Sequence, residues 1–140
     1  MQRELTDEGG SKLNFKVGRG GLADIDFLVE LVQIREGRTR SEFRTPGTRR
    51  LLTARPSTRY IMPTEYRQLR ESYQFLRTVE ILARMDMDIS TNSIRADSTA
   101  LEPLGKRMGL AQPSGEHLLS SYREVTERVR AIYTTVLARL

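Results

Sequence analysis

The sequence predicts an all-α protein, a helical bundle of about five helices with at most a short strand-like piece near residues 12–17. Two long segments, 63–87 and 113–140, repeat apolar residues at intervals of three and four, the spacing of one helix face. Prolines and capping residues stand where several segments begin, and glycines stand where they end. Strand-like alternation is confined to a few residues, so we expect helices to build the core.

The first part of the chain is expected to hold a helix tail, an extended piece and a central helix. Residues 1–10 indicate the end of a helix stopped by two glycines, and 12–17 alternate polar and apolar side chains. A helix is predicted from Gly20 to Arg35, ended by Gly37. Apolar residues wrap most of its circumference, which predicts burial on nearly all sides. Its single polar stripe consists of Asp26, Glu30 and Gln33. A polar stripe on a buried helix needs partners, whether arginines, a metal or substrate.

The middle of the chain is predicted to hold an exposed basic loop over 37–43 and a short helix over 46–54. Thr45 is the expected cap of the short helix. A connector over 55–62 follows, because a proline there cannot continue a helix. The long helix over 63–87 opens with Pro-Thr-Glu, a common helix start.

The last part of the chain is predicted to be a loop followed by two helices. Residues 88–96 are expected to form that loop, with at most a brief strand at 88–90. Asp97 caps a short helix that ends at Gly109, and the final helix begins near Pro113. Its apolar seam, typical of a bundle, comprises Leu118, Tyr122, Val125, Val129, Ile132 and Val136.

Composition limits the class of protein. A chain of 140 residues forms one domain with a real core. No apolar run is long enough to span a membrane, and the polar start is no secretion signal. The chain has no cysteine, which excludes disulfides and fits a cytoplasmic protein. The single histidine, His117, makes zinc or histidine-based catalysis improbable, and no metal site is expected.

A net charge of +5 raises the question of an acidic partner. The arginines run from Arg3 to Arg139 beside many carboxylates, and only residues 35–44 and Arg49-Arg50 come near a cluster. No aromatic residues interleave with them as single-strand binding requires, so dispersed ion pairs are the favoured explanation and nucleic acid is not. A stand-alone basic helical module that binds nucleic acid or a protein partner stays as the alternative.

The segment from Lys16 to Glu30 is the most informative motif. Three glycines and the basic residues Lys16 and Arg19 lead directly into a helix with Asp24 and Asp26 in its first turns. Glycines allow close backbone approach, and a helix start favours anions and carboxylates. Asp24 and Asp26 lie two apart and so point to nearly opposite sides, which argues against joint chelation of a metal.

The wider pattern resembles the helical domain of the bifunctional glutamine synthetase adenylyltransferase/adenylyl-removing enzymes. The first likeness is Lys16-x-Gly-x-Gly-Gly-Leu-x-Asp-Ile-Asp-Phe27, although this family commonly has glutamate at position 26 and glutamine at 30. The second is Tyr73-Gln-Phe-Leu-Arg-Thr-Val-Glu80, and the third is the Leu101–Gly109 segment. The fourth is the last helix, 122–137, with its Thr-Glu-Arg-Val-Arg run. Residues 1–140 are therefore expected to be a single helical domain, a fragment of a larger multidomain enzyme.

The resemblance implies where the motif lies. The motif is expected at the junction with a nucleotidyltransferase domain, with Gly20, Gly21, Asp24 and Asp26 toward its nucleotide cleft. Lys16 and Arg19 are then available for phosphate charge.

Glu80 falls in the apolar stripe of its helix and is costly to bury unless paired. With Arg77 nearby, we expect a structural ion pair, its arginine supplied by another helix or by the vicinity of the motif.

The resemblance also implies the activity of the parent enzyme. It transfers AMP from ATP, with Mg²⁺, to a tyrosine of glutamine synthetase, removes AMP by phosphorolysis, and responds to the PII signal protein. The motif and the chain ending look more like the C-terminal, adenylylating unit, while related uridylyltransferases share this domain type. This chain has no Gly-Ser turn followed by Asp-x-Asp, the magnesium-binding pattern of that superfamily, so we expect no catalytic residue here and an inactive fragment.

Overall fold

The structure, a computed structural model, describes residues 12–86 and 93–140. Those residues form an all-α fold with one short antiparallel pair of strands, as the sequence predicts. Its elements are β1 (Lys12–Asn14), α2 (Leu22–Gly37), the 3-10 turn η2 (Ser41–Phe43), α3 (Thr48–Ala54), α4 (Pro63–Asp86), β2 (Ser93–Arg95), α5 (Ser98–Arg107) and α6 (Ser114–Arg139).

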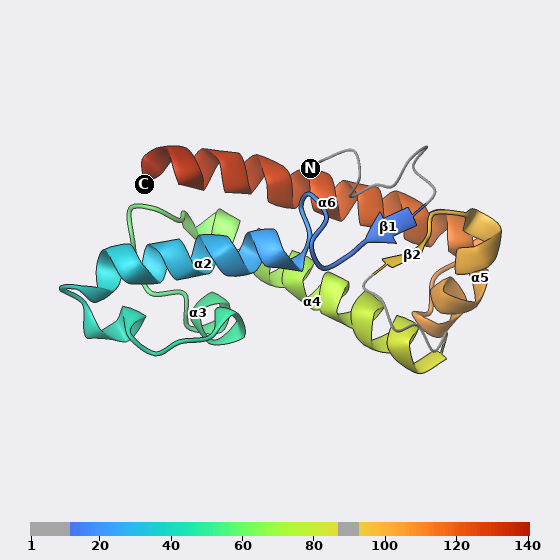
Figure 1. Ribbon diagram of the computed structural model, residues 1–140, viewed down its shortest axis with the longest axis horizontal. Helices are drawn as coiled ribbons and strands as arrows, with labels where there is room; N and C mark the ends of the chain where they lie inside the picture. Colours follow the sequence, from blue (N-terminus) through green and yellow to red (C-terminus); the bar gives the residue numbers. More distant parts are fainter. Residues whose placement is uncertain (1–11, 87–92) are drawn as a thin grey trace.

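Helix α6 runs along most of the length of the molecule, and the other elements pack against it or beside it (Figure 1). Helices α2 and α4 both contact α6. Helix α5 packs on α6 at the end of the molecule that carries the strands, and α3 lies at the opposite end, against α2 and α4. The C-terminus lies at the α3 end of the molecule (Figure 1).

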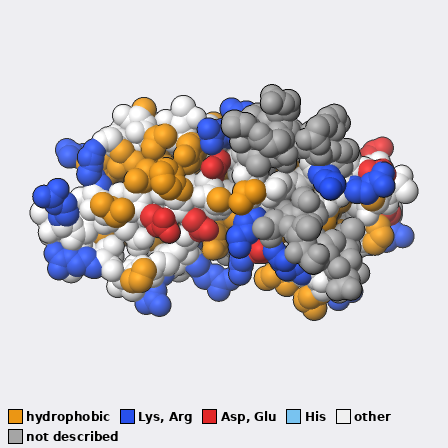
Figure 2. Space-filling model, in the orientation of Figure 1, with side chains coloured by type: hydrophobic (Ala, Val, Ile, Leu, Met, Phe, Trp, Pro, Cys, Tyr) orange, Lys and Arg blue, Asp and Glu red, His pale blue; other side chains and the backbone are white. Residues whose placement is uncertain are grey.

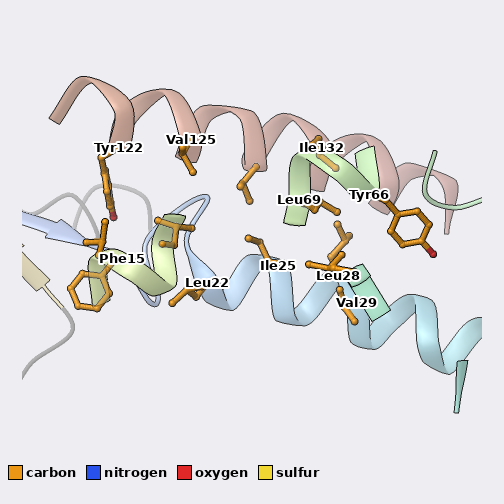
Figure 3. Packing of buried hydrophobic residues seen from close by; sticks show 14 of the residues in the cluster. Phe15, Leu22, Ile25, Leu28, Val29, Tyr66, Leu69, Tyr122, Val125 and Ile132 are labelled. Carbon is orange, nitrogen blue, oxygen red and sulfur yellow. The ribbon is translucent and has the colours of Figure 1, made fainter. Parts of the chain in front are cut away.

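The core lies between α2, α4 and α6 (Figure 3). The six predicted seam residues of α6 are all buried, because each turn of the helix returns an apolar side chain to the same face. They meet Leu22, Ile25, Leu28 and Val29 of α2 and Leu69 of α4 (Figure 3). Burial of this seam is the main stabilising term of the fold.

Helices α5 and α6 approach each other closely because glycines stand at their contact. A Cβ added at Gly105 would lie 2.4 Å from the Ser114 carbonyl oxygen, and one at Gly115 would lie 1.8 Å from that of Ser98. The Glu102 carboxylate accepts hydrogen bonds from the backbone N–H groups of Ser114 and Gly115, at 3.4 and 2.7 Å. A side chain of one helix thus caps the next, a contact that the sequence motif alone does not reveal.

The two strands pair in antiparallel register, with Leu13 opposite Ile94. The extended piece expected near 12–17 is therefore a strand over its first three residues. The prediction that 88–96 forms a loop is wrong over 93–95, because Ile94 finds a buried place beside Leu13. The brief strand suggested at 88–90 and the helix tail suggested at 1–10 lie outside the described residues.

Three other expectations are corrected by the packing. Helix α2 is not buried on nearly all sides, since Phe27 is 48% and Ile34 69% exposed. The predicted exposed loop over 37–43 holds a 3-10 turn whose Phe43 is buried. Thr45 does not cap α3; its carbonyl instead accepts a hydrogen bond from the Gln33 amide, and Gly47 holds the cap position.

The remaining helix boundaries agree with the predictions to within a few residues. The Asp97 side chain accepts a hydrogen bond from the Thr99 N–H at 3.0 Å and caps α5 as expected. Within the described ranges, no helix is both long and apolar enough to cross a bilayer.

Candidate functional site

The glycine loop, residues 15–21, turns the chain from β1 into α2. The Gly18 N–H donates to the Asn14 carbonyl at 3.0 Å, and the Gly21 N–H donates to the Gly18 carbonyl at 2.8 Å. The first two N–H groups of α2, those of Leu22 and Ala23, donate to loop carbonyls at 3.1 and 2.7 Å. The loop itself therefore satisfies donors that a phosphate would otherwise use at a helix start.

Gly20 brings the loop into contact with α6. Its φ of +76° is in the left-handed region, and an added Cβ would lie 2.1 Å from the Thr126 carbonyl oxygen. At Gly21 the added Cβ would lie 2.9 Å from the carbonyl oxygens of Gly18 and Phe15. Both glycines are buried, so close backbone packing explains why they are needed.

Asp24 joins the glycine loop, α2 and α6. Its Oδ2 atom accepts hydrogen bonds from the Gly20 N–H at 2.7 Å and from the Arg130 guanidinium at 3.0 Å. Arg130 also stacks over Tyr133, with 4.5 Å from the guanidinium carbon to the ring centre. The carboxylate expected toward a cleft thus connects two of the family-like motifs, which lie 106 residues apart.

Asp26 lies on the other side of α2, as its spacing from Asp24 predicts. Its Oδ1 atom accepts a hydrogen bond from the Thr48 hydroxyl of α3 at 2.6 Å. Lys16 and Arg19 are exposed on the glycine loop. The structure therefore brings Gly20, Gly21 and Asp24 together, places Asp26 elsewhere, and leaves the two cations open to solvent.

The carboxylates of the motif do not fit a magnesium site. The Asp24 carboxylate already accepts hydrogen bonds from Arg130 and from the Gly20 N–H, and the Asp26 carboxylate accepts one from the Thr48 hydroxyl of α3. Among residues 12–86 and 93–140, no group of three metal-binding side chains comes together. No chemical step through Mg²⁺ can therefore be assigned to these carboxylates.

Glu80 is buried within α4 and lies between two arginines. Its carboxylate contacts the Arg77 guanidinium at 2.5 Å and that of Arg84 at 3.3 Å. The predicted ion pair of Arg77 with Glu80 is confirmed. The expectation that another helix supplies the arginine is wrong, because both partners lie on α4, at spacings of three and four residues. The arginine heads remain partly exposed, so the pair keeps contact with water while the carboxylate is covered.

An apolar face is exposed along α2 and α6, from the second turn of α2 to its last turn. We define the α2–α6 apolar face as Phe27, Ile34, Tyr133 and Leu137. Ile34 is 69% and Leu137 40% exposed, and the rings of Phe27 and Tyr133 lie 6.4 Å apart between their centres. Figure 2 shows hydrophobic side chains gathered over this part of α2 and α6. The sequence does not predict this face, because apolar residues all around α2 indicate burial on nearly all sides. The spacing of seven between Phe27 and Ile34 is the signal that places both on one side of the helix.

Comparison with known proteins gives the family. A sequence model described as GlnD PII-uridylyltransferase matches residues 2–137 of the chain. The chain belongs to this family. The match covers the glycine loop, Asp24 and the Arg130 that pairs with it.

Curated members similar to this chain are named bifunctional glutamine synthetase adenylyltransferase/adenylyl-removing enzymes. The one from Streptomyces coelicolor is 30% identical over 124 residues, which cover 89% of this chain and 12% of the relative. The relative from Leifsonia xyli subsp. xyli is 29% identical over 142 residues, which cover 99% of this chain and 14% of the relative. That from Xanthobacter autotrophicus is 34% identical over 96 residues, 69% of this chain. The chain thus spans only about an eighth of the length of the relatives it matches.

Proposed function

We propose that this chain is the helical domain of a glutamine synthetase adenylyltransferase, a single domain over residues 1–140 of a larger enzyme. In this proposal it braces a nucleotidyltransferase domain and lines one side of that domain's ATP cleft. The observation that carries the proposal is the exposed α2–α6 apolar face, which begins on the helix that the glycine loop opens. Exposed apolar residues of this kind are typical of surfaces that another protein unit covers.

The motif supports a bracing role for this chain. Its carboxylates and glycines hold α2 against α6 and α3. These contacts fix the relative positions of α2 and α6, and therefore the α2–α6 apolar face that a neighbouring domain would contact. Lys16 and Arg19 are open to solvent on the glycine loop, and we assign them to phosphate charge at the cleft. Adenylyl transfer itself is assigned to the nucleotidyltransferase domain, which holds ATP and Mg²⁺, so the chain alone is inactive.

The activity of the whole enzyme is part of the proposal. It transfers AMP from ATP to a tyrosine of glutamine synthetase and removes it by phosphorolysis, in the cytoplasm, under control of the PII signal protein. The names of the relatives support the two adenylyl reactions. The description of the matching family supports a second candidate, a uridylyltransferase that acts on PII.

A chimera tests this proposal. In the full-length Streptomyces coelicolor relative, this chain replaces the matching segment, and radiolabelled AMP transfer from ATP to glutamine synthetase is measured. We expect the chimera to be active and the isolated chain to be inactive. A chimera that folds but lacks AMP transfer, together with a matching chimera of a PII uridylyltransferase that keeps UMP transfer, would reassign the chain to the second candidate.

Matched variants locate the contact surface. Ile34→Asp, in the last turn of α2, places a charge on the α2–α6 apolar face, whereas Met85→Asp places one at a residue of similar exposure, 66%, in the last turn of α4. If a neighbouring domain covers the face, Ile34→Asp lowers transfer about tenfold or more, because an unpaired charge becomes buried. Met85→Asp is expected to leave transfer nearly unchanged. Equal effects of the two variants would contradict the assignment of the face.

A further inference from the structure

The basic charge of the chain is concentrated at one end of the molecule. Between residues 35 and 59 stand eight arginines, no lysine and two glutamates, an excess of +6, so the rest of the chain carries −1 of the net +5. These residues form the end of α2, the turn η2, helix α3 and the connector to α4. Figure 2 shows Lys and Arg side chains around the corresponding end of the molecule. The excess lies within one continuous stretch of the sequence, so the expectation of dispersed arginines is wrong for residues 35–59.

Half of these arginines are held in place by the protein. Arg40 pairs with Glu36 and Glu42, at 3.5 and 2.9 Å, and Arg44 donates to the Gly37 carbonyl at 2.7 Å. Arg35 and Arg59 stack over the Tyr60 ring, 5.7 and 5.2 Å from its centre. Because these side chains are already ordered, a partner that binds them loses less conformational entropy.

The other four arginines are open to a partner. Arg38, Arg49, Arg50 and Arg55 are exposed, and no hydrogen bond or ion pair to another described residue holds their guanidinium groups. Two shallow hollows, of about 500 and 660 Å³, meet at Pro46. Arg38 and Arg44 line the first together with Glu30. Arg49 and Arg50 line the second, whose lining holds no carboxylate among the described residues, so acidic side chains can enter there between the guanidinium groups.

We infer that this arginine end, residues 35–59, is a docking surface for a protein partner that presents clustered carboxylates. Arginine rather than lysine is the residue enriched in protein interfaces, and its planar fork binds a carboxylate through two hydrogen bonds. The first hollow adjoins the α2–α6 apolar face, because Ile34 lines both. The second hollow, with Arg49 and Arg50, is lined by no residue of that face, so binding there does not depend on the proposed contact with a nucleotidyltransferase domain.

Nucleic acid is disfavoured by the aromatic residues at this end. Phe43 is buried with Arg40 stacked on its ring at 4.8 Å, and Tyr60 is buried beneath two arginines. Neither ring is available for base stacking. Helix α3 has only seven residues, and the connector over 55–62 is too long for the tight turn between two DNA-binding helices.

The test uses poly-L-glutamate as the carboxylate probe and a random-sequence DNA duplex as the phosphate probe. Binding of the whole chain to each is measured by fluorescence anisotropy at physiological salt. The variant Arg49→Glu/Arg50→Glu is compared with Lys106→Glu/Arg123→Glu, which changes the net charge equally at exposed residues of α5 and α6. Circular dichroism verifies that each variant is folded.

We expect the α3 variant to weaken poly-L-glutamate binding about tenfold and the control variant to weaken it less than about twofold. Arg49→Lys/Arg50→Lys keeps the charge but removes the planar guanidinium that binds a carboxylate through two hydrogen bonds. This variant should weaken poly-L-glutamate binding about threefold. Equal weakening by the two charge reversals, or a duplex that binds about tenfold more tightly than poly-L-glutamate, would overturn the inference. Phe27→Asp, at an exposed residue of the α2–α6 apolar face that lines neither hollow, should bind poly-L-glutamate like the wild type, which separates this test from that of the proposed function.

Discussion

Replacement of Gly20 by alanine tests whether the glycine loop is built to pack against α6. Gly20 combines two constraints, a φ of +76° and an added Cβ only 2.1 Å from the Thr126 carbonyl oxygen. Gly109 provides the matched control, because its φ is +77° but nothing lies within 4 Å of an added Cβ. The two substitutions therefore share the backbone cost and differ in the contact with α6.

The magnitudes follow from these two terms. The left-handed conformation costs an alanine about 1–2 kcal/mol, and the reduced entropy of the unfolded chain offsets part of this, so Gly109→Ala should lower the free energy of unfolding by about 1 kcal/mol. At Gly20 the obstacle is a main-chain oxygen, which no side-chain rotation removes. The loop must move away from α6 by more than about 1 Å to reach ordinary contact, at a further cost of about 2–3 kcal/mol. The movement also weakens the pair of Asp24 with Arg130.

Urea unfolding of the two variants, followed by circular dichroism, measures the difference directly. We expect Gly20→Ala to be less stable than Gly109→Ala by about 2 kcal/mol or more, which in thermal unfolding is a shift of roughly 5–10 °C for a chain of this size. A difference within about 0.5 kcal/mol would refute the argument, because it would mean that the contact with Thr126 does not constrain the loop.

Three further predictions concern stability. A double-mutant cycle of Asp24→Ala and Arg130→Ala should give a coupling free energy of about 0.5–1.5 kcal/mol in urea unfolding, because the two form a partly buried pair; a value of zero would mean that the pair contributes nothing. Glu102→Ala should lower the free energy of unfolding by about 1–2 kcal/mol, since it removes the acceptor for two N–H groups of α6, whereas an unchanged urea midpoint would contradict this capping role. Burial raises the pKa of Tyr66 from 10.0 to about 12. The stability that the folded protein gains by keeping this hydroxyl protonated is therefore fully present below pH 10 and is lost as the pH rises toward 12. Tyr66→Phe should therefore reduce the alkaline loss of stability, by up to about 1.4 kcal/mol per pH unit in this range, and an identical pH profile would contradict the assignment.

The sequence by itself determined most helices and their ends. The boundaries of α4, α5 and α6 follow from local signals, namely an opening proline, the Asp97 cap and the three- and four-residue spacing of the seam. These signals are readable because capping and periodicity act within a few residues along the chain. The motif that begins at Lys16 was likewise recognisable, since glycines and acidic residues at a helix start have a restricted set of uses.

Only the tertiary structure decided which residues these motifs contact. Asp24 pairs with Arg130, Asp26 accepts from Thr48, and Glu102 caps α6, and each partner is distant in the sequence or belongs to another element. Helical periodicity likewise cannot tell a core face from an exposed apolar face, so Ile34 was assigned to the core. The eight arginines of residues 35–59 are neighbours in the sequence, but only the fold shows that η2 and α3 pack beside α2 and so hold them at one end of the molecule. Contacts between elements depend on how helices pack, and a single sequence carries no local signal for that geometry.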